Sequence, residues 1–224
     1  MNATLANYRD AVDHLPEGAT LLVREVLWED YEGLLEELAG RPGIRASYDR
    51  GNLEIMSPLP DHEQYKRFFE RMIDALGDYL DMNVEPLGSA TWKKKADARG
   101  TEPDTCYYVA NAERIIGKRS IDLSIDPPPD LAVEIDSTNE SLSKVPIYAS
   151  LKVPEIWRYE VRHNRVQMYG LRGNDYVETA SSVSFPVLTP VALAEFVEVK
   201  KTKGQKAAMA AFRNWLKTQT STVS

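Results

Sequence analysis

The sequence has few of the residues that most metal and redox sites require. It contains one cysteine and three histidines in 224 residues. One cysteine can form neither an internal disulfide nor a cysteine-rich zinc site, and no His-x-x-x-His pair is present. The sequence also lacks a glycine-rich phosphate loop, a Rossmann fingerprint and a G-x-S-x-G nucleophile elbow. The common signatures of zinc enzymes, nucleotide-binding proteins and serine hydrolases are therefore missing.

Long hydrophobic runs are also absent. No apolar stretch reaches the roughly 18 residues of a membrane-spanning helix. The first residues show no basic segment followed by an apolar core, which would indicate a secretory signal. We therefore expect a cytoplasmic protein with no membrane segment, long enough to bury one sizeable core in a single domain, 1–224.

Positive charge is scarce except at the carboxyl end. The chain has 27 basic and 34 acidic residues and a formal net charge of -7, which argues against a general nucleic-acid coat. Residues 200–224 carry six basic residues and no acid, so the rest of the chain is at -13. This tail is interpreted either as a solvated terminal helix or as an attachment surface for a polyanion.

Hydrophobic periodicity predicts an α/β (α+β) protein. Apolar residues at helical spacing predict helices at 28–39, 61–80, 141–152 and 205–218. A capping box formed by Asp61 and Gln64 is expected at the start of the second helix. Strands are predicted at 45–57 (two, around a turn at 50–52), 83–88, 90–95, 105–110, 131–136, 155–161, 165–171 and 175–180. A mixed β-sheet flanked by helices is the natural assembly of these elements.

Acidic residues in apolar strands are the clearest chemical signal. Glu134 interrupts the apolar strand LAVEID at 131–136, where a carboxylate must be paired, protonated or bound to a metal. Asp136 shares its face of the strand, about 6–7 Å away. Asp104 begins another strand after Pro103; its ordinary interpretation is an Asx cap. Two acids on neighbouring strands would also form an oxygen-ligand site of the kind Mg²⁺ prefers.

Lysines near these acids have two interpretations each. Lys144 lies at the start of the helix after the Glu134 strand, on the same face as Tyr148. It is either a solvated side chain or part of an acid–acid–lysine site. Lys93 and Lys95 share one face of a predicted strand, which is either solvated or in contact with nucleic acid. Cys106 is predicted to be a buried structural thiol.

Pro103-Asp104 followed by Glu134-Ile135-Asp136 resembles the motif of the PD-(D/E)XK nuclease superfamily. More narrowly, the chain is similar to the bacterial Uma-type family of putative restriction endonucleases. The similar segments are GNLEIMSPLPDHE at 51–63, RGTEPD at 99–104, PDLAVEIDS at 129–137 and VPIYASLKVPEIW at 145–157. The resemblance implies a restriction-endonuclease-like core at about 20–180, with additional antiparallel strands and a basic C-terminal helical extension at about 200–224.

The resemblance also implies roles for particular residues. Asp104 and Glu134 would hold Mg²⁺ or Mn²⁺. Asp136 stands where the motif has a lysine, and Lys144 on the following helix is the candidate to replace that lysine. His62 and Glu63 are possible accessory residues. Helical periodicity points His62 inward and Glu63 nearly opposite.

The function implied is that of a metal-dependent endonuclease acting on DNA, and a homodimer is expected from the resemblance alone. A non-catalytic scaffold or a protein or nucleic-acid interaction module is the main alternative, because of Asp136 in the lysine position and the -13 body. A glycosidase with paired carboxylates is a weaker interpretation, since the four tryptophans are dispersed along the sequence.

Overall fold

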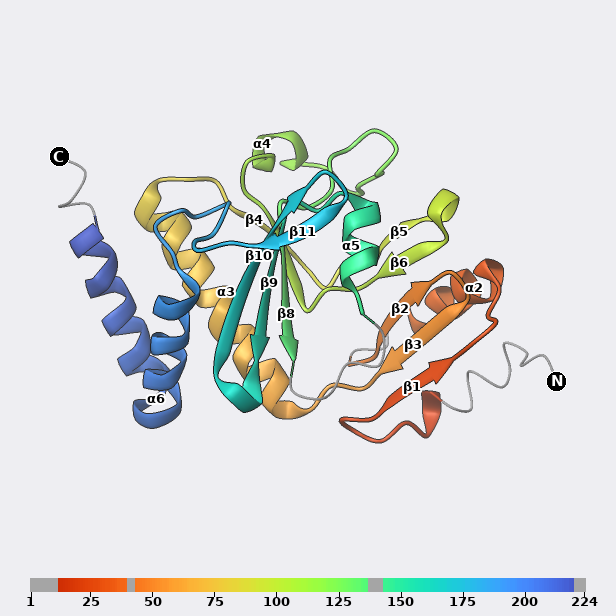
Figure 1. The fold of residues 1–224 in the computed structure, drawn as a ribbon, viewed down its shortest axis with the longest axis horizontal. Coiled ribbons are helices and arrows are strands. Elements are labelled where there is room, and N and C mark those ends of the chain that lie inside the picture. The colour runs from red at the N-terminus through yellow and green to blue at the C-terminus, as the bar shows by residue number, and fades with distance from the viewer. Residues whose placement is uncertain (1–11, 40–42, 137–142, 220–224) are drawn as a thin grey trace.

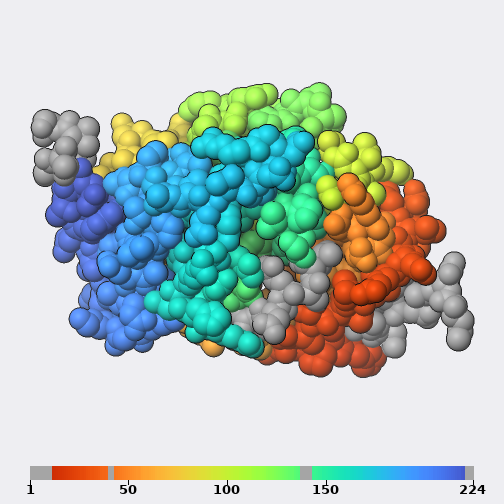
Figure 2. Space-filling view, in the orientation of Figure 1, coloured from red at the N-terminus to blue at the C-terminus, as the bar shows by residue number. Residues whose placement is uncertain are grey.

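The computed structural model describes residues 12–39, 43–136 and 143–219, and Figure 1 shows their arrangement. Two β-sheets lie side by side with helices around them, so the α/β class is confirmed. In the space-filling view of Figure 2, the N-terminal sheet in red and orange and the C-terminal helix in blue lie at opposite ends of the molecule.

The larger sheet is mixed and contains the strand with Glu134 near its centre. Its strands, in spatial order, are β11 (Asp175–Glu178), β10 (Arg165–Arg172), β9 (Glu155–Glu160), β8 (Leu131–Asp136), β7 (Thr105–Tyr108) and β4 (Glu85–Gly88). β8 and β9 are parallel, and every other neighbouring pair in this sheet is antiparallel. The central position predicted for the strand at 131–136 is confirmed.

The additional antiparallel strands form a second sheet of their own. In spatial order they are β1 (Thr20–Val23), β3 (Asn52–Met56), β2 (Arg45–Asp49), β6 (Arg99–Thr101) and β5 (Trp92–Lys94). The predicted turn between β2 and β3 is confirmed, with a φ of 91° at Gly51, a conformation that glycine adopts readily. β1 and β6, of four and three residues, were not predicted.

Helices cover both sheets. They are α2 (Trp28–Leu38), α3 (Pro60–Leu80), α4 (Ala112–Ile115), α5 (Val145–Leu151) and α6 (Pro190–Gln219), with single 3-10 turns η1 (Lys95–Asp97) and η2 (Val161–His163). α3 begins with Pro60 after Leu59 as N-cap and has no side-chain cap, so the predicted capping box of Asp61 and Gln64 is wrong. A proline at the first helical position already has the required φ.

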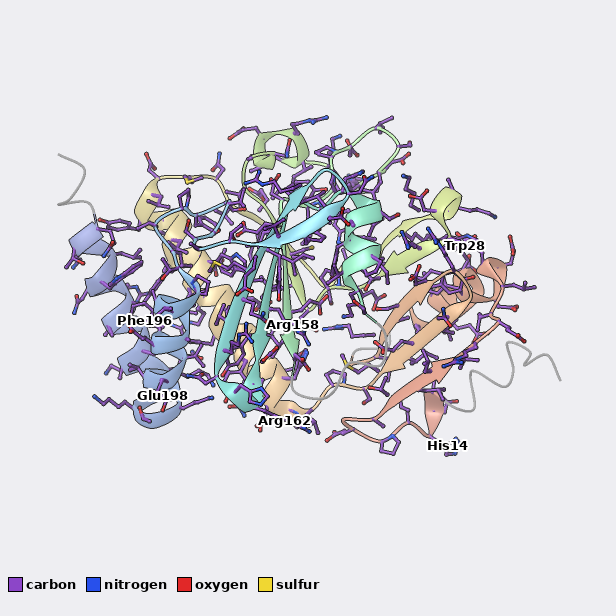
Figure 3. The ribbon with its side chains drawn as sticks, in the orientation of Figure 1. His14, Trp28, Arg158, Arg162, Phe196 and Glu198 are labelled. Carbon is purple, nitrogen blue, oxygen red and sulfur yellow. The ribbon has the colours of Figure 1, made fainter. Side chains whose placement is uncertain are left out.

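The C-terminal helix is longer than predicted and is interrupted. Gly204, with φ 82° and ψ 164°, breaks α6 into two segments, and only the second had been predicted, at 205–218. Phe196 of the first segment packs edge-on against Phe212 of the second, with ring centroids 5.0 Å apart. The two segments therefore lie side by side, as Figures 1 and 3 show.

The central strand β8 is buried on both faces. Leu131, Val133 and Ile135 belong to the core that α3 and α6 form over one face. Ala132, on the other face, packs with Cys106 and α5. Each large apolar side chain buried in this way contributes roughly 1.5–3 kcal/mol. The buried position predicted for the Cys106 thiol is confirmed.

α5 lies between the two sheets, in contact with β5 and β6 of the antiparallel sheet and with β11 of the mixed sheet. Its predicted range of 141–152 is confirmed from Val145 to Leu151, with Pro146 in the first turn, while 141–142 lie outside the described residues. Within the part of the chain that the structure describes, no helix combines the length and the apolar character needed to cross a membrane.

Candidate active site

Strand pairing brings the two predicted acids together. Thr105 of β7 pairs with Val133 of β8 in antiparallel register, so Asp104 lies opposite Glu134. The backbone N–H of Ile135 donates to Asp104 Oδ2 at 2.7 Å. Asp104 is 1% exposed and Glu134 is 6% exposed. Two carboxylates are therefore buried side by side, where they need compensating charge.

Two residues of one helical turn hold both oxygens of Glu134. Lys144 Nζ donates to Glu134 Oε2 at 2.9 Å, and the Tyr148 hydroxyl donates to Oε1. Pro146 follows Lys144 directly, and the helix it starts places residues 144 and 148 one turn apart on one face. The predicted proximity of Lys144 to the acids is therefore what the structure shows.

Asp104 has two basic side chains as neighbours on other elements. His62 Nε2, from the first turn of α3, lies 3.0 Å from Asp104 Oδ2, and His62 is buried as predicted. Arg45 Nε, from the start of β2, lies 3.9 Å from Asp104 Oδ1. Neither the Arg45 Nε nor the Asp104 Oδ1 atom has a hydrogen-bond partner in the described structure. Asp104 thus has one oxygen bonded to the backbone and one oxygen that can accept a further ligand.

The antiparallel sheet turns a polar face toward this site. Ser47 and Thr101 are buried there with Arg45, and their hydroxyl oxygens are 2.8 Å apart. Glu54 of β3 is 5% exposed, and its negative charge helps to raise the pKa of Lys144. The second sheet therefore forms a polar wall of the site.

The surroundings separate the pKa values of the two acids. Burial raises the pKa of Glu134 to about 7, against the opposing charge of Lys144 and with the repulsion of Asp104 added. Burial also acts to raise the pKa of Asp104, but His62, Lys144 and the Ile135 amide together hold it below the ordinary value. Asp104 is therefore ionised at neutral pH, whereas Glu134 gains or loses its proton near neutral pH.

Lysine 144 remains a cation. Burial acts to lower its pKa, but the charges of Glu134 and Asp104 outweigh burial and raise it above the ordinary value. The pKa of the buried Tyr148 hydroxyl is also raised, by burial and by Glu134, so the hydroxyl keeps its proton. Both groups are therefore hydrogen-bond donors to Glu134 at physiological pH.

The donor set fits a hard divalent cation. Mg²⁺ and Mn²⁺ are commonly held by one or two carboxylates, with waters and substrate phosphates completing the coordination. Asp104 Oδ1, buried and without a hydrogen-bond partner, is such a donor next to Glu134. Within ranges 12–39, 43–136 and 143–219, no three His, Cys, Asp or Glu side chains converge as a metal-binding group. The residues therefore fit a site of two carboxylates rather than a closed protein cage.

Two of the predicted accessory residues, Asp136 and Glu63, have partners outside the pair of buried acids. Asp136 accepts a bond of 2.6 Å from Arg158 of β9, labelled in Figure 3, and not from a group near Asp104. Glu63 is on the outer side of α3, paired with Arg45 at 3.5 Å and Lys66 at 3.4 Å. Asp136 and Glu63 are thus each held in ion pairs of their own.

The two lysines predicted on one strand face are not both on a strand. Lys93 lies in β5, but Lys95 opens the 3-10 turn η1, so that part of the prediction is wrong. Lys93 pairs with Glu32 of α2 at 2.7 Å, and Lys95 pairs with Glu29 at 3.3 Å. Their positive charge is therefore largely balanced by α2.

Arg45, Glu54 and Tyr148 were not predicted as site residues. Arg45 and Glu54 alternate with apolar residues on β2 and β3, a pattern that also describes a solvated strand face. Tyr148 was noted only for sharing a helix face with Lys144. The signal that could have identified Glu54 is the same as for Glu134, an acid between apolar neighbours.

Comparison with protein-family models gives a match. No curated protein matches the chain. The model of the Uma2 family, described as putative restriction endonuclease, matches residues 28–198, which include every residue of the site and most of the chain. This agrees with the resemblance of the sequence segments around Asp104 and Glu134. The chain belongs to the Uma2 family of putative restriction endonucleases.

Proposed function

We propose that the protein is a metal-dependent endonuclease that hydrolyses phosphodiester bonds of DNA, with Asp104 and Glu134 as ligands of Mg²⁺ or Mn²⁺. The observation that carries this proposal is the buried group of two carboxylates and one lysine: Glu134 in β8, Asp104 directly before β7 and Lys144 at the N-cap of α5. Membership in a family of nucleases supports it. A bound divalent cation would supply Lewis acidity toward a phosphate oxygen and a lowered pKa of water.

The chain's own groups have distinct tasks in this hydrolysis. Water attacks phosphorus, and the bond to the leaving sugar oxygen breaks. Lys144, held as a cation, stabilises negative charge that develops on the phosphate oxygens and is not a base. Glu134, as a ligand of the bound cation, would act as a carboxylate, and the proton released by the attacking water would pass to solvent while the leaving sugar oxygen takes one up. Tyr148 keeps Glu134 in one orientation.

Nicking of supercoiled plasmid tests the assignment. We expect Asp104→Asn and Glu134→Gln each to abolish nicking in Mg²⁺ or Mn²⁺ while the proteins stay folded. Asp136→Asn, which changes an acid two residues from Glu134 that is bonded to Arg158, is the matched control and should retain nicking. Equal activity of Asp104→Asn and the unmodified protein would disprove the site.

A non-catalytic scaffold is the second candidate. It is favoured by the occupation of both Glu134 oxygens by the protein's own donors, Lys144 and Tyr148. Calorimetry discriminates the two: the nuclease binds Mg²⁺ or Mn²⁺ at millimolar concentration and Asp104→Asn loses that binding, whereas a scaffold gives no heat. A homodimer, proposed from the resemblance alone, is checked by sedimentation velocity.

A further inference from the structure

Two hollows meet at Glu63 on the outer side of α3. The first, of about 480 Å³, lies beside the buried acids and is lined by Glu17, Gly43, Arg45, Pro58, Leu59, Pro60, Glu63, Lys66 and Ser89. The second, of about 450 Å³, leads toward the break in α6 and is lined by Glu63, Gln64, Arg67, Lys200, Gly204 and Gln205. Both are lined by Glu63 and so adjoin at this residue, and together they are called the depression along α3.

Among the residues that line this depression, cations outnumber carboxylates, although the chain is acidic overall. Its lining contains four cations, Arg45, Lys66, Arg67 and Lys200, and two carboxylates, Glu17 and Glu63. Two further acids lie close by: Glu70 pairs with Arg67 at 3.3 Å, and Asp61 acts on Lys200. The formal net charge of the whole chain is -7. With these two acids counted, four cations face four carboxylates, so the surroundings are formally neutral and repel an anion less than the rest of this acidic chain does.

Glu63 occupies the position of an anion between two of these cations. Its carboxylate lies 3.5 Å from Arg45 and 3.4 Å from Lys66, longer than the roughly 2.7–2.9 Å of a strong charge-assisted bond. The Glu63 side chain is 42% exposed, whereas those of Arg45 and Lys66 are 10% and 11% exposed. The cations are thus fixed by packing, and the carboxylate between them can turn out to solvent.

Arg45 connects this position to the buried acids. Its Nη2 faces Glu63 in the depression, while its Nε lies 3.9 Å from Asp104 Oδ1 inside the site. An anion held by Arg45 and Lys66 is therefore next to the carboxylates proposed to act on a phosphodiester.

We propose that the depression along α3 binds the sugar–phosphate backbone of DNA, with one phosphate seated between Arg45 and Lys66 in place of the Glu63 carboxylate. From this seat the backbone runs past Arg67 to Lys200 at the break in α6. The proposal rests on the proposed function in taking DNA as the ligand. It makes Glu63 an internal competitor for the phosphate rather than a metal ligand.

Removal of the competitor is the primary test. Binding of a fluorescent DNA duplex is measured by anisotropy in EDTA, so that no cleavage occurs. Glu63→Gln removes one negative charge and frees the seat, and we expect about tenfold tighter binding, the effect of one charged hydrogen bond. Glu32→Gln is the matched control, because Glu32 is also partly exposed and also lies between two cations, Lys93 and Lys95. Its affinity should be that of the unmodified protein.

Removal of the cations tests the course proposed for the DNA backbone along the depression, from Arg45 and Lys66 past Arg67 to Lys200, which we call the track. Lys66→Met should weaken binding and lower the dependence of log affinity on log salt by about one unit. Since Lys66 is buried, its replacement can prevent folding. Arg67→Ala and Lys200→Ala, on more exposed residues, are expected to weaken binding in the same way.

Unchanged affinity of Arg67→Ala and Lys200→Ala overturns the track. Tighter binding by Glu32→Gln but not by Glu63→Gln overturns the seat and places DNA at the Lys93 and Lys95 surface. Absence of binding by both the unmodified protein and Glu63→Gln overturns the proposal as well.

Failure of the track and failure of the nuclease assignment give different results. Asp104→Asn should lose nicking and retain DNA binding. If it does, and Glu63→Gln leaves affinity unchanged, only the track is wrong. If Glu63→Gln binds more tightly but Asp104→Asn still nicks DNA, only the catalytic assignment is wrong.

Discussion

Replacement of Lys144 by methionine is the most informative perturbation of the buried site. Lys144 Nζ donates to Glu134 Oε2 at 2.9 Å, and both side chains are more than 90% buried. Methionine keeps much of the volume of the lysine stem but removes its charge and its donors. Glu134 then keeps only the Tyr148 hydroxyl as a hydrogen-bond donor among the contacts seen in the structure.

The size of the effect follows from the geometry. Opposite unit charges 2.9 Å apart attract by about 6 kcal/mol at an effective dielectric constant of roughly 20. Desolvation of the two groups offsets part of this, and removal of one partner of a buried pair typically costs about 3–5 kcal/mol. We expect this loss in the free energy of unfolding at pH 8.5. It is a large part of the roughly 5–15 kcal/mol that stabilises a domain.

The loss should shrink as the pH falls. The pKa of Glu134 is raised from 4.5 to about 7 in the folded protein, so the folded state binds more protons than the unfolded state between these values. Stability therefore decreases as pH rises through this range. Without Lys144, which acts to lower the pKa of Glu134, the range extends further upward. At pH 5 Glu134 is protonated in the folded variant, and most of the deficit disappears.

Urea unfolding followed by tryptophan fluorescence, in EDTA at pH 8.5 and pH 5, measures this effect. In the double variant Lys144→Met/Glu134→Gln, the uncompensated charge is absent, and about 2 kcal/mol of the loss at pH 8.5 should be recovered. Lys118→Met, which breaks a surface pair with Asp126, is the control and should change stability little. An equal loss at both pH values, or a double variant no more stable than Lys144→Met, would refute the reasoning.

Three further outcomes are expected. Tyr148→Phe removes the hydroxyl that orients Glu134, so the pH optimum of nicking should shift. The control is Tyr176→Phe, which removes a hydroxyl bonded to the backbone of residue 153 and should leave the pH profile unchanged. Burial raises the pKa of Cys106 to about 12, so the native protein should not react with a thiol reagent at pH 8, while the urea-unfolded protein should react at once. A Cβ at Gly100 would lie 2.5 Å from the Tyr31 hydroxyl. Gly100→Ala should therefore lower the free energy of unfolding by about 1–3 kcal/mol in the same urea assay. An unchanged value would mean that Tyr31 can move aside.

The strand with Glu134 could be predicted from the sequence because its signal is local. Six residues that alternate between two apolar faces, with prolines before them, define a buried strand, and a carboxylate in such a strand requires compensation. The identity of the compensating group is not local. The position of Lys144 at a helix start made it a candidate, but such a lysine is most often solvated, and the resemblance to a nuclease motif was needed to give it a role.

The polar wall of the site could not be predicted for a different reason. Alternation on β2 and β3 shows that Ala46 and Ile55 face a core. The opposite face has the same polar sequence pattern whether water or another sheet covers it. Arg45 and Glu54 occupy that second face, and in the folded protein they are only 8% and 5% exposed. The pairing of β6 with β2, about 50 residues apart in sequence, likewise could not be predicted, because a strand of three residues has too short a sequence pattern.

The site is therefore completed by the contact between the two sheets and not by either sheet alone. The mixed sheet with α5 carries Glu134, Lys144 and Tyr148, and Asp104 enters the same sheet at β7, while the antiparallel sheet supplies Arg45. Without this contact the approach of Arg45 to Asp104, at 3.9 Å, would be lost, and removal of one partner of a buried ion pair costs several kcal/mol. The same ionised groups that the proposed chemistry needs thus favour the one arrangement of the sheets that brings them together. Because Arg45 also faces the depression along α3, this arrangement places the proposed phosphate seat directly beside the buried acids.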